Sequence, residues 1–249
     1  MECRECTNRN KLDFEFTMAF QPIVNLETQT IFAHEALVRG LNNESAQAIF
    51  QHINDSNRYL FDQSCRTTAI RLAAELHIPC FLSINFLPNA VYEPERCIRT
   101  TLEAAETYGF PIEQIIFEIT ESEQITDLVH LRKIVEYYRA RGFKTAIDDF
   151  GAGYAGLNLL SEIQTDLIKL DMALIRGIDQ DKVRQAIVKG VLQVAGELSS
   201  LVIAEGIETQ AELTTLQGLG INLFQGFYFA KPTFQSLAQI PSDRFVNVA

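Results

Sequence analysis

The sequence predicts a single α/β domain folded as a modified, TIM-like (β/α)8 barrel with an antiparallel first strand. Short apolar runs alternate with amphipathic segments along most of the chain, and this alternation is typical of parallel βα units. Eight strand-like runs occur within 249 residues, which suits a (β/α)8 barrel in both number and length. No change in composition divides residues 15–249, so we expect one domain there, preceded by a polar tail or linker remnant at residues 1–14.

The antiparallel first strand follows from the spacing of the first two strand-like runs, residues 19–24 and 31–39. The residues between them are too few for the crossover that a parallel pair requires. The two runs are therefore expected to pair as an antiparallel hairpin. Helical patterns follow at residues 45–53 and 58–76.

The other six strand-like runs alternate with amphipathic helices. One helix begins at Asp127, places Leu131 and Tyr138 on one face, and is expected to end at Gly142. A second helix with the same apolar period begins at Asp181. The six predicted strands are residues 81–86, 115–120, 145–150, 167–171, 201–206 and 223–227.

The composition is that of an ordinary soluble globular protein, with 47% apolar and 21% charged residues. The formal net charge of −11 argues against binding of DNA or RNA polymers or of anionic membranes, because such binding depends on clustered lysine and arginine. No apolar run approaches the length of a membrane span, and the N-terminal stretch lacks the apolar core of a signal peptide. We therefore expect a cytoplasmic protein without membrane insertion.

The five cysteines include one closely spaced pair, Cys3 and Cys6. A C-x-x-C pair could be half of a zinc site or a redox pair. No second pair of ligands completes such a site, and the two residues lie in a polar terminal stretch. Reduced thiols in a loose tail are therefore expected.

Polar side chains mark the ends of the predicted strands, where an apolar core would not accommodate them. The C-terminal ends of the parallel strands of a barrel converge on one mouth, so these side chains are expected to meet there. A single residue of this kind is more often solvated or ion-paired than a ligand, but suitable groups occur on successive strands. They are Gln21 and Arg39 on the hairpin, followed by Glu35, Asn85, Glu118, Asp148, Asp149, Lys169, Glu205 and Gln225.

The carboxylates in this set predict a site for divalent cations. Gathered in a medium of low dielectric constant, they would repel one another strongly unless cations neutralised them. All-oxygen ligands favour Mg²⁺ or Mn²⁺ over Zn²⁺. Bound cations would also allow an acidic protein to take an anionic substrate.

The adjacent pair Asp148 and Asp149 narrows the type of site. Neighbouring residues point to opposite faces of a regular strand, so both reach the mouth only if the chain already turns there, as Gly151 and Gly153 would permit. One carboxylate shared by two cations, with the next acid on the second, is the arrangement of two-metal phosphoryl transfer. Lys169 would then orient or deprotonate the attacking water, or neutralise charge developing on the phosphate.

These motifs together resemble those of the EAL-domain phosphodiesterases, which hydrolyse the bacterial second messenger cyclic di-GMP to linear pGpG. The resemblance extends from about residue 14 to about residue 234, with the motifs in the family's order. Any one motif is weak, since three residues such as Glu-Ala-Leu often occur by chance. The matching segments are Gln21-Pro22, Glu35-Ala36-Leu37 with Arg39, Asn85 in LSINF, Glu118-Ile119-Thr120-Glu121, Asp148-Asp149-Phe150-Gly151, Lys169 in IKLD, Ala204-Glu205-Gly206-Ile207-Glu208 and Gln225-Gly226-Phe227.

The resemblance implies a role for each residue and two Mg²⁺ or Mn²⁺ ions in the site. It implies that the first metal is held by Glu35, Asn85, Glu118 and Asp148, and the second by Asp148, Asp149 and Glu205. It implies catalytic roles for Lys169, which would contact the attacking water, for Glu205, and for Glu121, which would anchor the loop after the fifth strand. It implies a homodimer formed beside that loop, and substrate contacts from Gln21, Leu37, Arg39, Gln225 and Glu208.

The loop after the predicted fifth strand departs most from the family, since Ala152 and Ala155-Gly156 stand where many members carry hydroxyl residues. Gly40 likewise replaces a common aromatic residue. We expect an active cyclic di-GMP phosphodiesterase in which unusual behaviour, if any, arises from residues 152–156. Two alternatives remain open: a catalytically silent cyclic di-GMP receptor or protein-interaction module, and a metal-dependent barrel enzyme of the enolising kind.

Overall fold

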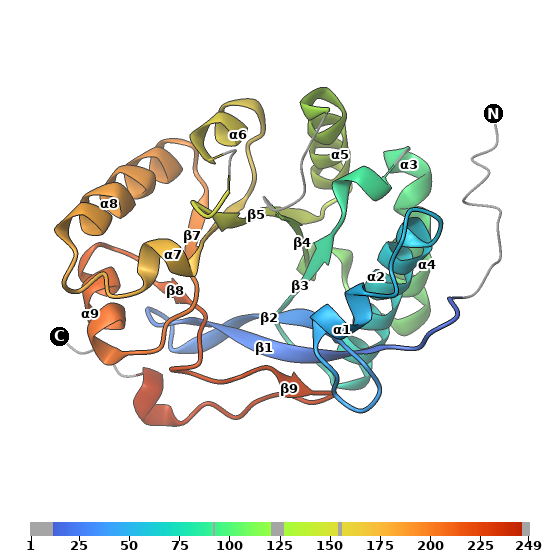
Figure 1. Ribbon diagram of the computed structural model, residues 1–249, viewed down its shortest axis with the longest axis horizontal. Coiled ribbons are helices and arrows are strands. Elements are labelled where there is room, and N and C mark those ends of the chain that lie inside the picture. Colours follow the sequence, from blue (N-terminus) through green and yellow to red (C-terminus); the bar gives the residue numbers. More distant parts are fainter. Residues whose placement is uncertain (1–11, 92, 121–126, 154–155, 246–249) are drawn as a thin grey trace.

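The computed structural model describes residues 12–91, 93–120, 127–153 and 156–245, and in them a closed barrel (Figure 1). Strands β2 to β8 follow one another around the barrel in chain order, and β1 closes the ring between β8 and β2. A short strand, β9, extends the sheet from β1. The strands are β1 Thr17–Asn25, β2 Thr30–Arg39, β3 Phe81–Phe86, β4 Ile115–Thr120, β5 Lys144–Phe150, β6 Leu167–Leu170, β7 Leu201–Ala204, β8 Leu223–Phe224 and β9 Thr233–Phe234.

Strand β1 runs against the rest of the barrel. It pairs antiparallel with both β2 and β8, whereas each neighbouring pair from β2 to β8 is parallel. The Asn25 side chain stabilises the tight hairpin turn by accepting hydrogen bonds from the backbone N–H groups of Glu27 and Thr28. The predicted fold, a modified (β/α)8 barrel with an antiparallel first strand, is therefore confirmed.

Helices surround the barrel and cover the outer, apolar faces of its strands (Figure 1). Asp127 and Asp181 cap α5 and α8, because their side chains accept hydrogen bonds from backbone N–H groups of the first turn. Helix α5 ends just before Gly142, whose φ of 97° suits a glycine. The helices are α1 Ala46–Phe50, α2 Arg58–Glu75, α3 Pro94–Cys97, α4 Arg99–Tyr108, α5 Leu128–Ala140, α6 Gly156–Glu162, α7 Met172–Ile175, α8 Lys182–Glu197 and α9 Gln210–Gly218.

Side chains inside the barrel form two layers. The lower layer is an apolar cluster made of Ile23, Ala33, Ile116, Ala146, Leu167, Ile203 and Leu223. Two residues further toward the C-terminal end of each parallel strand, the next inward side chain is polar, because side chains alternate between the two faces of a strand. On the antiparallel β1 the polar residue comes two positions earlier. The upper, polar layer holds Gln21, Glu35, Glu118, Asp148, Lys169, Glu205 and Gln225, each buried or half-buried.

Three strands, β6, β7 and β8, are shorter than predicted, so Glu205 and Gln225 lie just beyond their strands instead of within them. The chain leaves the sheet at Gly206, which adopts a φ of 67° that only glycine accepts readily. Gly226 packs so closely on Ile207 that a Cβ would lie 2.1 Å from the carbonyl oxygen of that residue. Two glycines thus shape the chain beside two expected site residues.

The predicted tail and its cysteines cannot be placed, since Cys3 and Cys6 lie outside the described residues. The domain boundary at residue 15 stays a prediction. Cys65, Cys80 and Cys97 are free thiols in apolar surroundings. Among the described residues, no helix has both the length and the apolar character needed to cross a membrane.

His34 contributes to the dependence of the stability of this fold on pH. The residue is buried on β2, and burial lowers its pKa from 6.5 to about 4. The unfolded chain therefore takes up a proton before the folded protein does, so stability is lost as pH falls from about 6.5 toward about 4. Between about pH 7.5 and about pH 5, the free energy of unfolding should fall by about 2 kcal/mol more for the wild type than for His34→Gln. Urea denaturation at both pH values measures this difference. Equal losses of unfolding free energy in the wild type and in His34→Gln would contradict the prediction.

Candidate active site

The polar layer faces a cavity of about 280 Å³ at the mouth of the barrel. The mouth lies at the C-terminal ends of the parallel strands, where barrel enzymes place their sites. Met172, which follows β6, and Phe227, which follows β8, contribute to its rim. Of the predicted site residues, those that line the cavity are Gln21, Glu35, Leu37, Asp148, Asp149, Lys169, Glu205, Glu208 and Gln225.

Lys169 lies at the centre of the polar layer, with its side chain 1% exposed. Its Nζ contacts carboxylate oxygens at 2.7 Å from Glu205, 2.8 Å from Asp148, 2.9 Å from Glu118 and 3.5 Å from Glu35. Burial alone would lower the pKa of Lys169, but these carboxylates outweigh burial and raise the pKa above its ordinary value. The surrounding carboxylates therefore hold the lysine as a cation.

Neutral side chains orient Glu35. Asn85 Nδ2 donates to one oxygen of its carboxylate at 2.9 Å, and Gln225 Nε2 donates to the other at 2.7 Å. Burial opposes ionisation of Glu35, but Lys169 and the two donors outweigh it and lower the pKa of the carboxyl group. Glu35 is consequently an ionised carboxylate with both oxygens held in place by hydrogen bonds.

The carboxyl group of Glu118 lies close to other negatively charged side chains. Burial and then the charge of Glu35 raise the pKa of its carboxyl group. The Ser83 hydroxyl donates a hydrogen bond to Glu118, a contact that sequence reasoning missed. The sequence does indicate this residue, because Ser83 lies two positions before Asn85 and therefore on the same inward face of β3.

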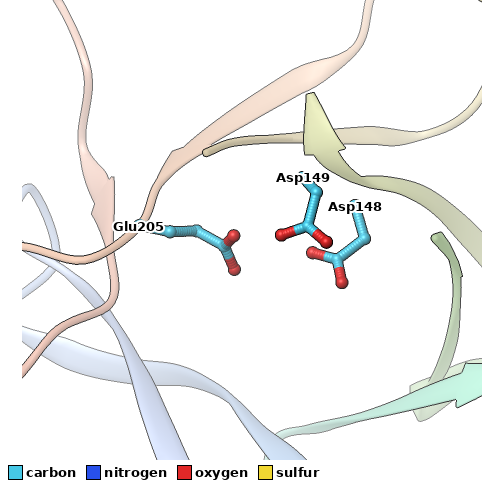
Figure 2. Close-up of side chains that lie close together, drawn as sticks. All are labelled: Asp148, Asp149 and Glu205. Carbon is cyan, nitrogen blue, oxygen red and sulfur yellow. The ribbon is translucent and has the colours of Figure 1, made fainter. Parts of the chain in front are cut away.

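Asp148 and Asp149 both face the cavity although they are neighbours on β5 (Figure 2). Asp149 makes this possible by adopting a φ of 54°, an uncommon conformation for a residue with a side chain. The pairing of β5 with β6 also shifts between Ile147 and Phe150, as in a β-bulge. The expected turn of the chain at these two acids is thus present. Oxygens of Asp148, Asp149 and Glu205 lie within 4.8 Å of one another.

The side chains at the mouth fit divalent cations. Burial, together with the charges of Asp148 and Asp171, raises the pKa of Asp149 to about 6, and burial raises the pKa of Asp148 and Glu205 as well. Burial is the first cause of these shifts and repulsion between the carboxylates adds to it, and bound cations would relieve both. Fully ionised, five carboxylates and one ammonium leave an excess of four negative charges, which two divalent cations would balance. The five carboxylates belong to Glu35, Glu118, Asp148, Asp149 and Glu205.

Gln225 offers a ligand an unused hydrogen-bond acceptor. Its Nε2 donates to Glu35, whereas its Oε1 is buried and has no hydrogen-bond partner within the described part of the chain. A buried acceptor without a donor costs about 1–3 kcal/mol. A ligand N–H or O–H reaching this oxygen would recover that cost.

Two of the predicted residues that the structure describes are less closely tied to this centre. Arg39 lies outside the set that lines the cavity, and its Nη1 donates to the carbonyl oxygen of Val38. Glu208 lies at the rim in an exposed, two-pronged ion pair with Arg176, at 2.6 and 2.7 Å. Glu121 falls outside the described residues.

Comparison with known proteins places the chain in a family. The family model described as the EAL domain matches residues 7–232. The chain belongs to the EAL-domain family. Its structure is similar to the c-di-GMP-bound form of a standalone EAL protein from Vibrio cholerae O395, with a TM-score of 0.92 and 57% identity over 95% of this chain and 100% of that one. The resemblance drawn from the motifs is therefore confirmed.

Other relatives carry the EAL domain within longer chains. Klebsiella pneumoniae BlrP1, in a manganese and cyclic di-GMP complex, is 37% identical with a TM-score of 0.86, over 90% of this chain and 58% of that one. The blue light- and temperature-regulated antirepressor BluF of Escherichia coli K12 is 34% identical over 89% of this chain and 55% of its own. A probable cyclic di-GMP phosphodiesterase of that bacterium, PdeN, is 26% identical over 94% of this chain and 45% of its own. The chain thus spans about half the length of these two curated relatives.

Lys169 should stabilise the EAL domain most when no metal is bound. Lys169→Met preserves the length of the side chain but leaves the surrounding carboxylates without their cation, and removal of one partner from a buried ion pair costs about 3–5 kcal/mol. In a chelator, the melting temperature of the variant should lie at least about 6 °C below that of the wild type. Mn²⁺ should narrow the gap, because it supplies the missing charge. Thermal unfolding in both conditions checks this, and a gap that Mn²⁺ leaves unchanged would count against it.

Proposed function

We propose that the protein is a divalent-metal-dependent phosphodiesterase that hydrolyses cyclic di-GMP to linear pGpG. The observation that carries the proposal is the crowded ring of carboxylates around Lys169, at the mouth of a barrel of the EAL family. Solved structures similar to this chain, from Vibrio cholerae and Klebsiella pneumoniae, contain cyclic di-GMP, and one of them also contains manganese.

The proposed metals are two ions of Mg²⁺ or Mn²⁺. When bound, such ions lower the pKa of an attacking water and stabilise the departing oxygen of a phosphodiester. The residues that would hold the first are Glu35, Asn85, Glu118 and Asp148. Those that would hold the second are Asp148, Asp149 and Glu205.

Lys169 and Glu205 divide the remaining chemistry in this proposal. Lys169, whose Nζ lies among the carboxylates of the proposed metal site, would orient or deprotonate the attacking water, or neutralise charge developing on the phosphate. Glu205, whose carboxylate lies 2.7 Å from Lys169 Nζ, would be a further acceptor for the proton that the water releases. The water oxygen bonds to phosphorus while the bond from phosphorus to the ribose 3′ oxygen breaks.

The shape of the mouth supports a substrate with two bases. A second, larger cavity of about 730 Å³ lies beside the first, between α1, α2 and the strands β2 and β3. The two cavities share Glu35, Leu37 and Asp148, so a dinucleotide could place one base on each side of its scissile phosphate. The residues proposed to contact it are Gln21, Leu37, Arg39, Gln225 and Glu208.

The proposal has three further parts. They are a catalytic role for Glu121, a homodimer formed beside the loop after β5, and a cytoplasmic location. Glu121 would anchor that loop as a further catalytic residue. A cytoplasmic location would place the protein with its proposed substrate, a bacterial second messenger.

A second candidate function is that of a catalytically silent cyclic di-GMP receptor or protein-interaction module. The observation that favours it is the relative BluF, which is named as an antirepressor. The two functions differ in whether the substrate is consumed. Membership of the EAL-domain family argues against the enolising kind of barrel enzyme.

Hydrolysis tests the proposal directly. The protein, incubated with cyclic di-GMP and Mg²⁺ or Mn²⁺, should release linear pGpG, as resolved by anion-exchange chromatography. With Mg²⁺ or Mn²⁺ present, Lys169→Ala should fold and retain nucleotide binding but lose most turnover, because it lacks the donor for the attacking water. If the wild type binds cyclic di-GMP yet forms no pGpG at any metal concentration, the receptor function is correct instead.

Asp149→Asn tests the assignment of two metals. Asparagine tolerates the left-handed backbone of this residue, so the fold should persist, while the charge on the second metal's ligand set falls. Calorimetric titration with Mn²⁺ should show two binding events. The affinity of the weaker one should fall about tenfold or more, and the affinity of the other should fall by less. Equal losses in both events would contradict the assignment of Asp149 to one metal alone.

A further inference from the structure

A buried ion pair lies on α2, away from the charged centre of the site. Arg66 is 0% exposed and Asp62 is 2% exposed. One guanidinium nitrogen of Arg66 contacts Asp62, and another donates to the Tyr138 hydroxyl at 3.2 Å. The guanidinium also lies over the rings of Phe86 and Phe117, with 5.6 and 5.3 Å to the ring centroids. The pair is therefore enclosed between α2, α5 and the outer faces of β3 and β4.

Stability alone does not account for this pair. Moving two charges out of water costs several kcal/mol for each ion, and well-packed apolar residues in their place are often equally stable or more so. The surroundings of Arg66 are aromatic, so an apolar side chain of similar length would pack there readily. We therefore expect the two charges to hold a neighbouring part of the chain in a position that apolar residues could not fix.

A hydrogen bond made by Asp62 identifies that position. Its Oδ1 accepts a hydrogen bond at 2.9 Å from the backbone N–H of Leu87. Leu87 is the first residue after β3, where the pairing of β3 with β4 has just ended at Phe86 and Ile119. An acceptor on α2 thus continues to hold the chain where the sheet no longer does.

Asn85 lies two residues before this anchor. It donates to Glu35, and both residues belong to the proposed ligand set of the first metal. Asp62 and Asn85 also line the same larger cavity between α2 and the strands. Any movement of the chain at Leu87 would therefore displace a proposed metal ligand.

We propose that Asp62 and Arg66 are positioning residues that set the affinity of the mouth for divalent cations. Arg66, held by Tyr138 and the two phenylalanine rings, fixes the carboxylate of Asp62. Asp62 in turn fixes the backbone after Asn85. The inference rests on the proposed function, since it takes Asn85 to be a metal ligand.

Two charge-free double variants separate positioning from packing. Asp62→Asn/Arg66→Met removes both charges but keeps an oxygen acceptor for the Leu87 N–H. Asp62→Leu/Arg66→Met removes the acceptor as well. Calorimetry with Mn²⁺ alone should give a dissociation constant within about threefold of the wild type for the first variant. For the second, the constant should rise by about tenfold or more, the usual effect of losing a group that orients a ligand.

Melting temperatures and circular dichroism establish that the two variants are equally folded, so that a difference in Mn²⁺ affinity reports position. Equal Mn²⁺ affinities in the two folded variants would overturn the inference while leaving the proposed function intact. A wild type that binds no Mn²⁺ would instead contradict the proposed function, and this inference with it.

Hydrogen exchange of the wild type tests the hydrogen bond between the Leu87 amide and Asp62 without any substitution. This test of the inference remains if the leucine variant does not fold. The Leu87 amide should exchange about 100-fold or more slowly than amides of exposed loops, because Asp62 holds it. Exchange at the rate of an exposed loop would overturn the inference.

Discussion

The contact of Lys169 with four carboxylates is the constraint on which the rest of the structure depends. Charges buried at this density destabilise a fold unless each is paired or hydrogen-bonded, and the barrel provides for both. The apolar layer beneath excludes water from one side of the cluster, and β2, β4, β5 and β6 each bring one member to the same height. Ser83 and Asn85 then donate to carboxylate oxygens that the lysine does not contact, and Gln225 donates to the Glu35 oxygen that lies 3.5 Å from Lys169 Nζ. A single ammonium group thus holds together acids that would otherwise drive the strands apart.

Local backbone strain follows from the same constraint. Two adjacent acids can serve one mouth only if the strand abandons its regular alternation, so Asp149 takes a left-handed conformation that costs about 1 kcal/mol or more. The close approach of Gly226 to Ile207 has a similar origin, because Gln225 must reach Glu35 from a chain that is leaving the sheet. The left-handed backbone of Asp149 and the close approach of Gly226 to Ile207 both lie next to residues of the polar layer. They are the usual signature of a functional site.

The barrel and most of its polar layer could be predicted because both rest on one rule, the two-residue alternation of strands. Once 116, 146, 167 and 203 are taken as inward apolar positions, Glu118, Asp148, Lys169 and Glu205 must follow on the same face. Contacts between elements obey no such rule. The contact of Asp62 with Leu87, or of Glu208 with Arg176, depends on how helices and loops pack on the barrel. Arg39 shows the reverse case, since its motif was recognised but its side chain turns to Val38.

The charge distribution also bears on the choice between enzyme and receptor. A receptor for an anionic dinucleotide would gain nothing from five carboxylates at its mouth, since they repel the phosphates that it must hold. Burial and mutual repulsion raise the pKa of Glu118, Asp148, Asp149 and Glu205, which means that the protein keeps these acids at a cost to its own stability. Divalent cations at the mouth would convert that cost into affinity, for metal and phosphate together. Glu118 supports this most strongly, because it is fully buried against Lys169 and stays an acid although burial and the charge of Glu35 raise its pKa.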